Sequence, residues 1–193
     1  MKSSKDSLLR KIKDCELCRK DLPCDPKPIL NFKKSTPIVL IGQAPGLKTH
    51  IAGVPWADQS GERLRSWLGL SNEQFYDLDL MAFVPMGFCY PGAGKSGDLP
   101  PMPRCAPTWH DLIFKRMENI KLKIYIGSYA YKYYFKNEKI TLTEKIKKMD
   151  LKNYILLPHP SPRNNIWIKK NKWFEEAYLP LIQKKIQKLV IKK

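Results

Sequence analysis

The sequence lacks any apolar run that approaches the roughly 20 residues needed to cross a bilayer as a helix. Its N-terminal stretch, MKSSKDSLLRKIKDCELC, is charged throughout and has no apolar centre of the kind found in secretion signals. These absences argue against a membrane-spanning or secreted protein. We therefore expect a cytoplasmic protein that has no membrane partner.

Acidic residues are scarce, with 18 Asp and Glu against 35 Lys and Arg, so the formal net charge is +17. A basic protein of this kind favours polyanionic partners, of which DNA and RNA are the commonest. A general lysine bias is the alternative, because the basic residues are spread along the chain. The C-terminal LIQKKIQKLVIKK can likewise be read as the solvated face of a terminal helix.

A nucleotide-triphosphate site is also missing. The segment GQAPG at 42–46 follows an apolar run, as a phosphate loop does, but it carries no lysine, and its proline removes one backbone donor. The segment GAGKSG at 92–97 resembles the end of a phosphate loop. However, Cys89 stands where the first glycine of that motif is required, and DLPPMP cannot open the following helix. Neither segment is an ATP site.

What the chain does contain is the composition of a folded protein, with 43% hydrophobic residues and five tryptophans in 193 residues. We expect one domain over 1–193, because no internal repeat or linker is visible. The pattern predicts strands at 37–42, 78–84, 122–127 and 153–157, helices at 4–14, 59–69, 106–118, 128–136, 142–148 and 171–190, and a loop from the second strand to about Met102. Strands that alternate with helices predict an α/β fold, a three-layer α/β/α arrangement with a central, mostly parallel four-stranded sheet.

The four predicted strands each end in a distinctive loop. These loops are GQAPG at 42–46, PMGFCYPG at 85–92, GSYA at 127–130 and PHPSPRN at 158–164. In open parallel sheets, ligands bind beyond the carboxyl ends of the strands. We therefore expect the functional site at the edge where these four loops meet.

The five cysteines suggest a metal centre. Cys15 and Cys18 form a C-x2-C pair, Cys89 and Cys105 follow much later, and Cys24 is left over. In a cytoplasmic protein such spacing indicates metal binding more than disulfides. Four thiolates suit either tetrahedral zinc or a [4Fe–4S] cluster, and ordinary free thiols are the third interpretation.

Two motifs carry a resemblance to a known family. IGQAPG after the first strand and HPSPRN after the last resemble the paired motifs of the uracil-DNA glycosylase superfamily. GVPWADQSGERL at 53–64 and the cysteine spacing are similar to the iron–sulfur branches, the fourth and fifth families. The resemblance runs from Cys15 to about Trp173. It implies that Cys15, Cys18, Cys89 and Cys105 hold a structural [4Fe–4S] cluster, with zinc as the less favoured alternative.

The resemblance also implies roles for individual residues. A DNA glycosylase takes a base out of the helix and cleaves its N-glycosidic bond, so it needs a donor for the departing base and a surface on which the base stacks. His159 occupies the family's donor position, and Trp56 matches the stacking aromatic. Gly42 and Gln43 line the base pocket by the same resemblance. The DNA-contacting loop comprises Ser161, Pro162, Arg163 and Asn164.

Two positions depart from the family pattern. Ala44 stands where several families carry an Asp or Asn that handles the attacking water. An alanine can neither orient nor deprotonate a water molecule. Asp58 matches the aspartate that the fifth family uses instead, although an N-terminal helix cap is its alternative role. Pro85 replaces the base-reading asparagine of the iron–sulfur branches. Gln43, Asn165 or backbone groups are then the candidates for reading the base, which extends the candidate bases to hypoxanthine and xanthine.

Three functions follow. The favoured one is a monofunctional DNA N-glycosylase, a base-excision-repair hydrolase that acts on uracil or another deaminated base, works as a monomer and uses His159 and Asp58. The second is a nucleic-acid-binding iron–sulfur relative with changed or lost catalysis, suggested by Ala44 and Pro85. The third is an iron–sulfur protein with a redox or scaffolding role.

Overall fold

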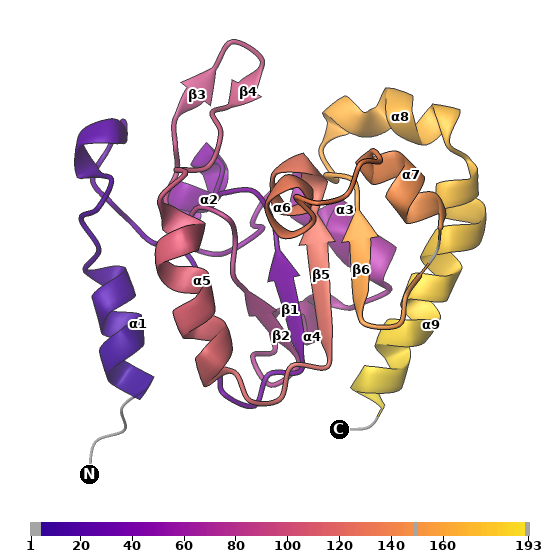
Figure 1. Ribbon diagram of the computed structural model, residues 1–193, viewed down its shortest axis with the longest axis horizontal. Helices are drawn as coiled ribbons and strands as arrows, with labels where there is room; N and C mark the ends of the chain where they lie inside the picture. The colour runs from indigo at the N-terminus through magenta and orange to yellow at the C-terminus, as the bar shows by residue number, and fades with distance from the viewer. Residues whose placement is uncertain (1–4, 149, 192–193) are drawn as a thin grey trace.

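The computed structural model describes residues 5–148 and 150–191, and its centre is a parallel sheet (Figure 1). β1 (Ile38–Ile41) lies between β2 (Met81–Phe83) and β5 (Leu122–Ile126), and β6 (Tyr154–Leu157) pairs with β5. All three pairings in this four-stranded sheet are parallel. The strands therefore end at one edge, the upper edge in Figure 1.

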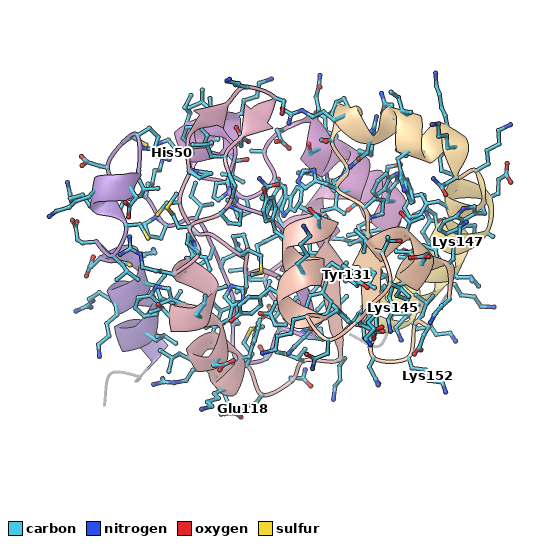
Figure 2. The ribbon with its side chains drawn as sticks, turned by 45° about the horizontal axis from the view of Figure 1, so that its top comes forward. His50, Glu118, Tyr131, Lys145, Lys147 and Lys152 are labelled. Carbon is cyan, nitrogen blue, oxygen red and sulfur yellow. The ribbon has the colours of Figure 1, made fainter. Side chains whose placement is uncertain are left out.

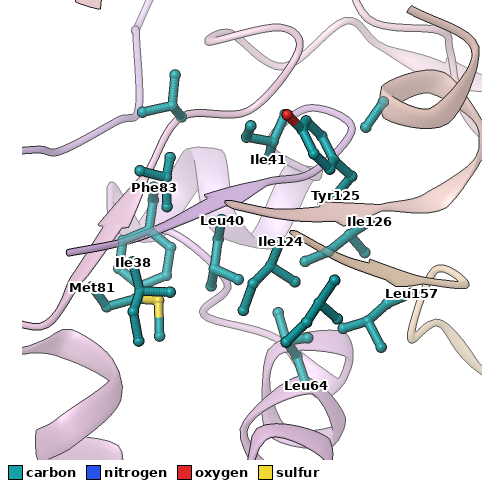
Figure 3. Close-up of a cluster of buried hydrophobic side chains, with 14 of the residues drawn as sticks. Ile38, Leu40, Ile41, Leu64, Met81, Phe83, Ile124, Tyr125, Ile126 and Leu157 are labelled. Carbon is teal, nitrogen blue, oxygen red and sulfur yellow. The ribbon is translucent and has the colours of Figure 1, made fainter. Parts of the chain in front are cut away.

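Apolar side chains on both faces of the strands build the core. All four residues of β1 are buried, which is typical of a strand covered by helices on both sides. Figure 3 shows Leu40 and Ile124 pointing toward Leu64 of α3 (Gln59–Leu68), whereas Tyr125 points to the opposite face. This alternation follows from the two-residue period of a strand.

Helices cover both faces, which confirms the predicted three-layer α/β/α fold. In Figure 1, α6 lies in front of β5, and α3 lies behind β5 and β6. α3 packs against α9, and α5 packs against α1. The helices are α1 (Lys5–Lys13), α2 (Leu47–Ala52), α3 (Gln59–Leu68), α4 (Asn72–Tyr76), α5 (Cys105–Arg116), α6 (Gly127–Tyr134), α7 (Leu142–Lys147), α8 (Asn165–Lys170) and α9 (Leu179–Val190).

Several predicted elements differ from the structure. The first helix was expected over 4–14 and spans Lys5–Lys13, with residue 4 outside the described residues. The short helices α2, α4 and α8 were not predicted, because five or six residues are too few to show a helical period. The last helix was expected from residue 171. Instead a π-helical turn, Phe174–Tyr178, precedes α9, whose first turn contains a proline that has no N–H to extend the preceding turn.

The expected loop before Met102 contains the most consequential difference. It folds into a small antiparallel hairpin, β3 (Ala93–Gly94) and β4 (Gly97–Asp98). Figure 1 shows this hairpin rising above the carboxyl ends of the sheet strands. A segment without apolar periodicity therefore forms part of the edge at which the site was expected.

The excess of basic residues is distributed over the molecule. Figure 2 shows Lys145, Lys147 and Lys152 at the end of the molecule far from His50. Lys145 pairs with Glu138 at 2.5 Å, and the Lys147 ammonium lies 5.7 Å from the ring centroid of Trp173.

No helix in the described parts of the chain is both long and apolar enough to span a membrane.

Candidate active site

A cavity of about 600 Å³ opens at the carboxyl edge of the sheet. Each of the four sheet strands leads into its wall, through the residues after β1, β2, β5 and β6. This arrangement confirms that the four loops meet there. The lining residues that the sequence had singled out are Gly42, Gln43, Ala44, Trp56, Asp58, Pro85, His159, Ser161, Pro162, Arg163 and Asn164.

His159 is held in one tautomer by its own loop. The backbone N–H of Ser161 donates to His159 Nδ1 at 3.3 Å, so that nitrogen is the acceptor, and Nε2 carries the proton of the neutral ring. Burial lowers the pKa of His159, and the nearby Asp58 carboxylate opposes part of this shift. Asn164 Nδ2 donates to the His159 carbonyl at 2.5 Å, and this hydrogen bond closes the loop between the two residues. The imidazole is therefore a neutral N–H donor at physiological pH.

Trp56 adopts an unusual backbone conformation beside His159. Its φ is 57°, a left-handed value that non-glycine residues rarely adopt. Two glycines leave room for it, because a Cβ on Gly42 would lie 2.7 Å from its Cζ2 and a Cβ on Gly61 would lie 1.8 Å from its carbonyl oxygen. The Tyr76 hydroxyl donates to that same carbonyl oxygen at 3.3 Å. These contacts hold a flat aromatic surface in the cavity wall.

Asp58 caps α3 and also lines the cavity. Its Oδ1 accepts a hydrogen bond from Gly61 N at 2.9 Å and so caps α3. It also lines the cavity with His159. Because the cap fixes one oxygen, the carboxylate is held in a defined position at the cavity wall.

The loop after β6 is anchored to α3. Arg63 Nη1 donates to the Ser161 carbonyl at 3.3 Å and to Asn165 Oδ1 at 2.8 Å. Asn165 is exposed and is not among the residues that line the cavity, so the structure does not bring it to the base pocket. Of the side chains considered for reading the base, Gln43 lines the cavity, and its Nε2 donates to the Leu99 carbonyl at 3.3 Å.

The two departures from the family pattern both lie in the cavity wall. A Cβ on Gly87 would come within 3.4 Å of the Ala44 methyl group, so Ala44 fits closely against the loop after β2. Pro85 lines the cavity, and its carbonyl accepts a hydrogen bond from His110 Nε2 at 2.9 Å. His110 is buried, and its Nδ1 is bonded to the Tyr134 hydroxyl. His110 of α5 thus holds the cavity-lining Pro85 in place through its backbone carbonyl.

The cavity also contains polar residues that sequence reasoning missed. Ser96 and Asp98 come from the hairpin, Tyr129 from the start of α6, and Thr49 from α2. Tyr129 lies in the GSYA segment, one of the four strand-end loops at which the site was expected, although the residue itself was not singled out. Asp98 had no such signal, because its position depends on how the hairpin folds back over the sheet.

Four cysteines converge on a second, smaller cavity. Cys15, Cys18, Cys89 and Cys105 all line it, together with apolar residues such as Phe88 and Trp109. Cys24 is not among its lining residues, and its sulfur lies 3.5 Å from His50 Nε2. The structure therefore separates the four cysteines of the predicted metal centre from the fifth.

The residues at this second cavity match a metal centre in the type of their side chains, which are four thiols, but not in their arrangement. Every cysteine is a free thiol, and burial raises the pKa of Cys89 to about 11 and that of Cys105 to about 12. Among the residues that the structure describes, no group of three or more His, Cys, Asp or Glu side chains is arranged to hold a metal ion. The four thiols are the ligand chemistry that both zinc and [4Fe–4S] clusters use.

Comparison with known families agrees with this geometry. A family model described as the uracil DNA glycosylase superfamily matches residues 31–183. The match begins before β1 and ends within α9, so it includes all four strands of the sheet, both motif loops and the hairpin. Since it covers most of the chain, the protein belongs to the uracil DNA glycosylase superfamily.

Proposed function

We propose that this protein is a DNA glycosylase that hydrolyses the N-glycosidic bond of uracil or another deaminated base. The observation that carries the proposal is the convergence of Trp56, Asp58 and His159 in one cavity at the carboxyl edge of the sheet. These residues come from two segments that are far apart in the sequence, and they supply a stacking surface, a carboxylate and a neutral N–H donor.

The departing base requires stabilisation of a negative charge. A base flipped into the cavity stacks on Trp56, and its oxygen accepts a hydrogen bond from His159 Nε2 as the glycosidic electron pair moves onto the base. A neutral imidazole suits this role because it donates a hydrogen bond without giving up its proton. The Ser161 N–H that occupies Nδ1 supports this assignment.

The sugar requires stabilisation of a positive charge. As the bond breaks, the sugar approaches an oxocarbenium ion, and a carboxylate nearby lowers the energy of that cation. Asp58 supplies this charge in our proposal. The cap that its Oδ1 makes to α3 keeps the carboxylate from turning away.

We further propose that the four converging cysteines bind a [4Fe–4S] cluster with a structural role. What supports it is the set of four thiols around one cavity and the resemblance to the iron–sulfur branches of the superfamily. The bound cluster would connect the segment before β1 with the loop after β2. No step of base removal passes through it.

A binding protein with changed or lost catalysis is the second candidate. Ala44 and Pro85 favour it, because neither side chain holds a water or a base by hydrogen bonds. The residues proposed to contact DNA, including Arg163 in the cavity wall, would then serve recognition alone. The two candidates differ in whether a base is released.

The test incubates the protein with single- and double-stranded oligonucleotides that contain uracil, hypoxanthine or xanthine and then cleaves abasic sites with alkali. Our proposal expects strand cleavage at one or more of these bases, and it expects His159→Ala to lose about 100-fold or more of the rate. His50→Ala is the matched control, since His50 does not line the cavity. DNA binding that is sensitive to salt, without release of any base, would establish the second candidate.

A further inference from the structure

Residues 97–99 join the two motif loops across the cavity. Gly97 has a φ of 120°, and the Arg163 guanidinium occupies the space where its side chain would stand, since a Cβ there would lie 1.8 Å from both terminal nitrogens. On the other side, the Leu99 carbonyl accepts the hydrogen bond from Gln43. The hairpin is thus attached to the loop after β6 and to the loop after β1.

Asp98 lies between these two attachments. Its Oδ2 lies 3.0 Å from the position that a Cβ on Gly46 would take, so the carboxylate reaches the GQAPG loop itself. It lines the same cavity as Asp58 and His159. Burial raises the pKa of the Asp98 carboxyl, the Asp58 charge raises it further, and the Arg163 guanidinium lowers it. A carboxylate with a raised pKa is the better proton acceptor.

The attacking water needs a residue that orients it, and the candidates named so far are poorly suited to this role. Ala44 cannot orient a water molecule, and one oxygen of Asp58 is used by the cap of α3. Within residues 5–148 and 150–191, no donor makes a hydrogen bond to the Asp98 carboxylate. The Asp98 carboxylate, whose charged neighbour is Arg163, can therefore still accept a hydrogen bond at the cavity.

We propose that Asp98 holds and deprotonates the water that attacks the sugar. This inference rests on the proposed glycosylase function. The water oxygen bonds to C1′ as the bond from C1′ to the base nitrogen breaks, and the electron pair of that bond leaves on the base. The water proton passes to the Asp98 carboxylate, and the base anion takes a proton from solvent after it is released. Asp58 keeps its electrostatic role toward the sugar cation.

The test compares Asp98→Asn with the wild-type protein in single-turnover base release over a range of enzyme concentrations. Asparagine keeps the shape of the side chain but cannot accept a proton. We expect the maximal rate to fall about 100-fold or more. The enzyme concentration at half-maximal rate does not rise, because loss of a negative charge near a phosphate does not weaken DNA binding. Asp98→Glu, which retains the carboxylate, recovers part of the rate.

Asp79→Asn is the matched control, because Asp79 is an exposed carboxylate that pairs with Lys33 near the opposite end of β2. It should match the wild-type rate. A rate for Asp98→Asn within threefold of wild type overturns the inference while the glycosylase function stands. Equal losses in rate and DNA binding also overturn it, because they show that Asp98 only holds the hairpin. If the wild-type protein releases no base at all, the proposed function fails, and the inference fails with it.

Discussion

The indole ring of Trp56 lies 5.8 Å from the imidazole ring of His159, centroid to centroid, with 34° between the ring planes. Trp56 lies between α2 and α3 and His159 lies in the loop after β6, so their contact depends on how the sheet places the segments that follow β1 and β6. Trp56 holds this position despite a left-handed backbone, a conformation that costs about 1–3 kcal/mol. Strain of this kind at a cavity wall is typical of a functional position.

Gly42→Ala tests the placement of Trp56. The new methyl group would lie 2.7 Å from Trp56 Cζ2, so the indole ring must move away from the cavity. We expect base release to fall by about tenfold to 100-fold, because small displacements of a binding surface are costly to catalysis. Single-turnover assays measure the loss of rate. We expect Trp56→Ala to lose rate as Gly42→Ala does, and Trp56→Phe, which keeps an aromatic ring, to lose less. Full activity in Gly42→Ala would show that the ring's position is unimportant.

Asp58→Asn and Asp58→Ala separate the two roles of Asp58. Asparagine still caps a helix, whereas alanine does not, so only the alanine variant should lose about 1 kcal/mol in the free energy of unfolding. Both variants lose the negative charge, and we expect base release to fall about tenfold or more in each. Urea unfolding and single-turnover assays provide the two measurements. An active Asp58→Asn variant would leave Asp58 with the cap alone.

His110 should make the stability of the protein depend on pH. Burial lowers the pKa of His110 to about 4, while an unfolded histidine titrates near 6.5. The unfolded state therefore binds more protons below about pH 6.5, and stability falls as the pH falls from there to about 4. Between pH 6.5 and pH 5 we expect a loss of about 2 kcal/mol from this residue. Burial also lowers the pKa of His159, which adds to the loss in the same direction.

Urea unfolding at several pH values measures this effect. His110→Gln removes the titrating group and should flatten the dependence in that range. Because His110 also fixes the Pro85 carbonyl, we expect the variant to release base more slowly even at pH 7. A variant with the same slope as the wild type would show that another group is responsible.

The cysteine centre is tested by comparing Cys89→Ser with Cys24→Ser. Cys89 lines the second cavity and Cys24 does not. After anaerobic purification, we expect the broad visible absorbance of an iron–sulfur cluster in the wild type and in Cys24→Ser, and its loss in Cys89→Ser. A colourless wild-type protein that contains zinc would instead support the alternative metal.

Arg163→Ala tests the proposed contact between the cavity wall and DNA. If Arg163 neutralises a phosphate, its removal weakens binding to all DNA sequences and reduces the slope of log affinity against log salt by about 1. Lys152→Ala is the control, since Lys152 precedes β6 and so lies at the opposite end of that strand from the loop that carries Arg163. Fluorescence anisotropy with labelled oligonucleotides at several salt concentrations measures both slopes. Equal slopes of log affinity against log salt for Arg163→Ala and the wild type would show that Arg163 does not contact a phosphate.

The pattern of apolar runs in the chain defines the strands from which the site is built. The apolar runs, such as Ile38–Ile41, set the strands, because a buried strand has to be apolar on both faces. The motif residues stand directly after these strands, so a parallel sheet gathers them at one edge whatever the details of the packing. This is why the positions of His159 and of the GQAPG loop at one cavity were predictable. Trp56 and Asp58 lie beyond α2, and only the resemblance to the family indicated that they belong to the same site.

Only the tertiary structure decided the rest of the wall. Asp98 enters the cavity because Gly97 and Leu99 contact residues more than fifty positions away, and no local pattern encodes such contacts. Asn165 turns to Arg63 instead of the pocket for the same kind of reason. Local periodicity sets the strands and the loops that follow them, but long-range packing decides which polar side chains complete the site.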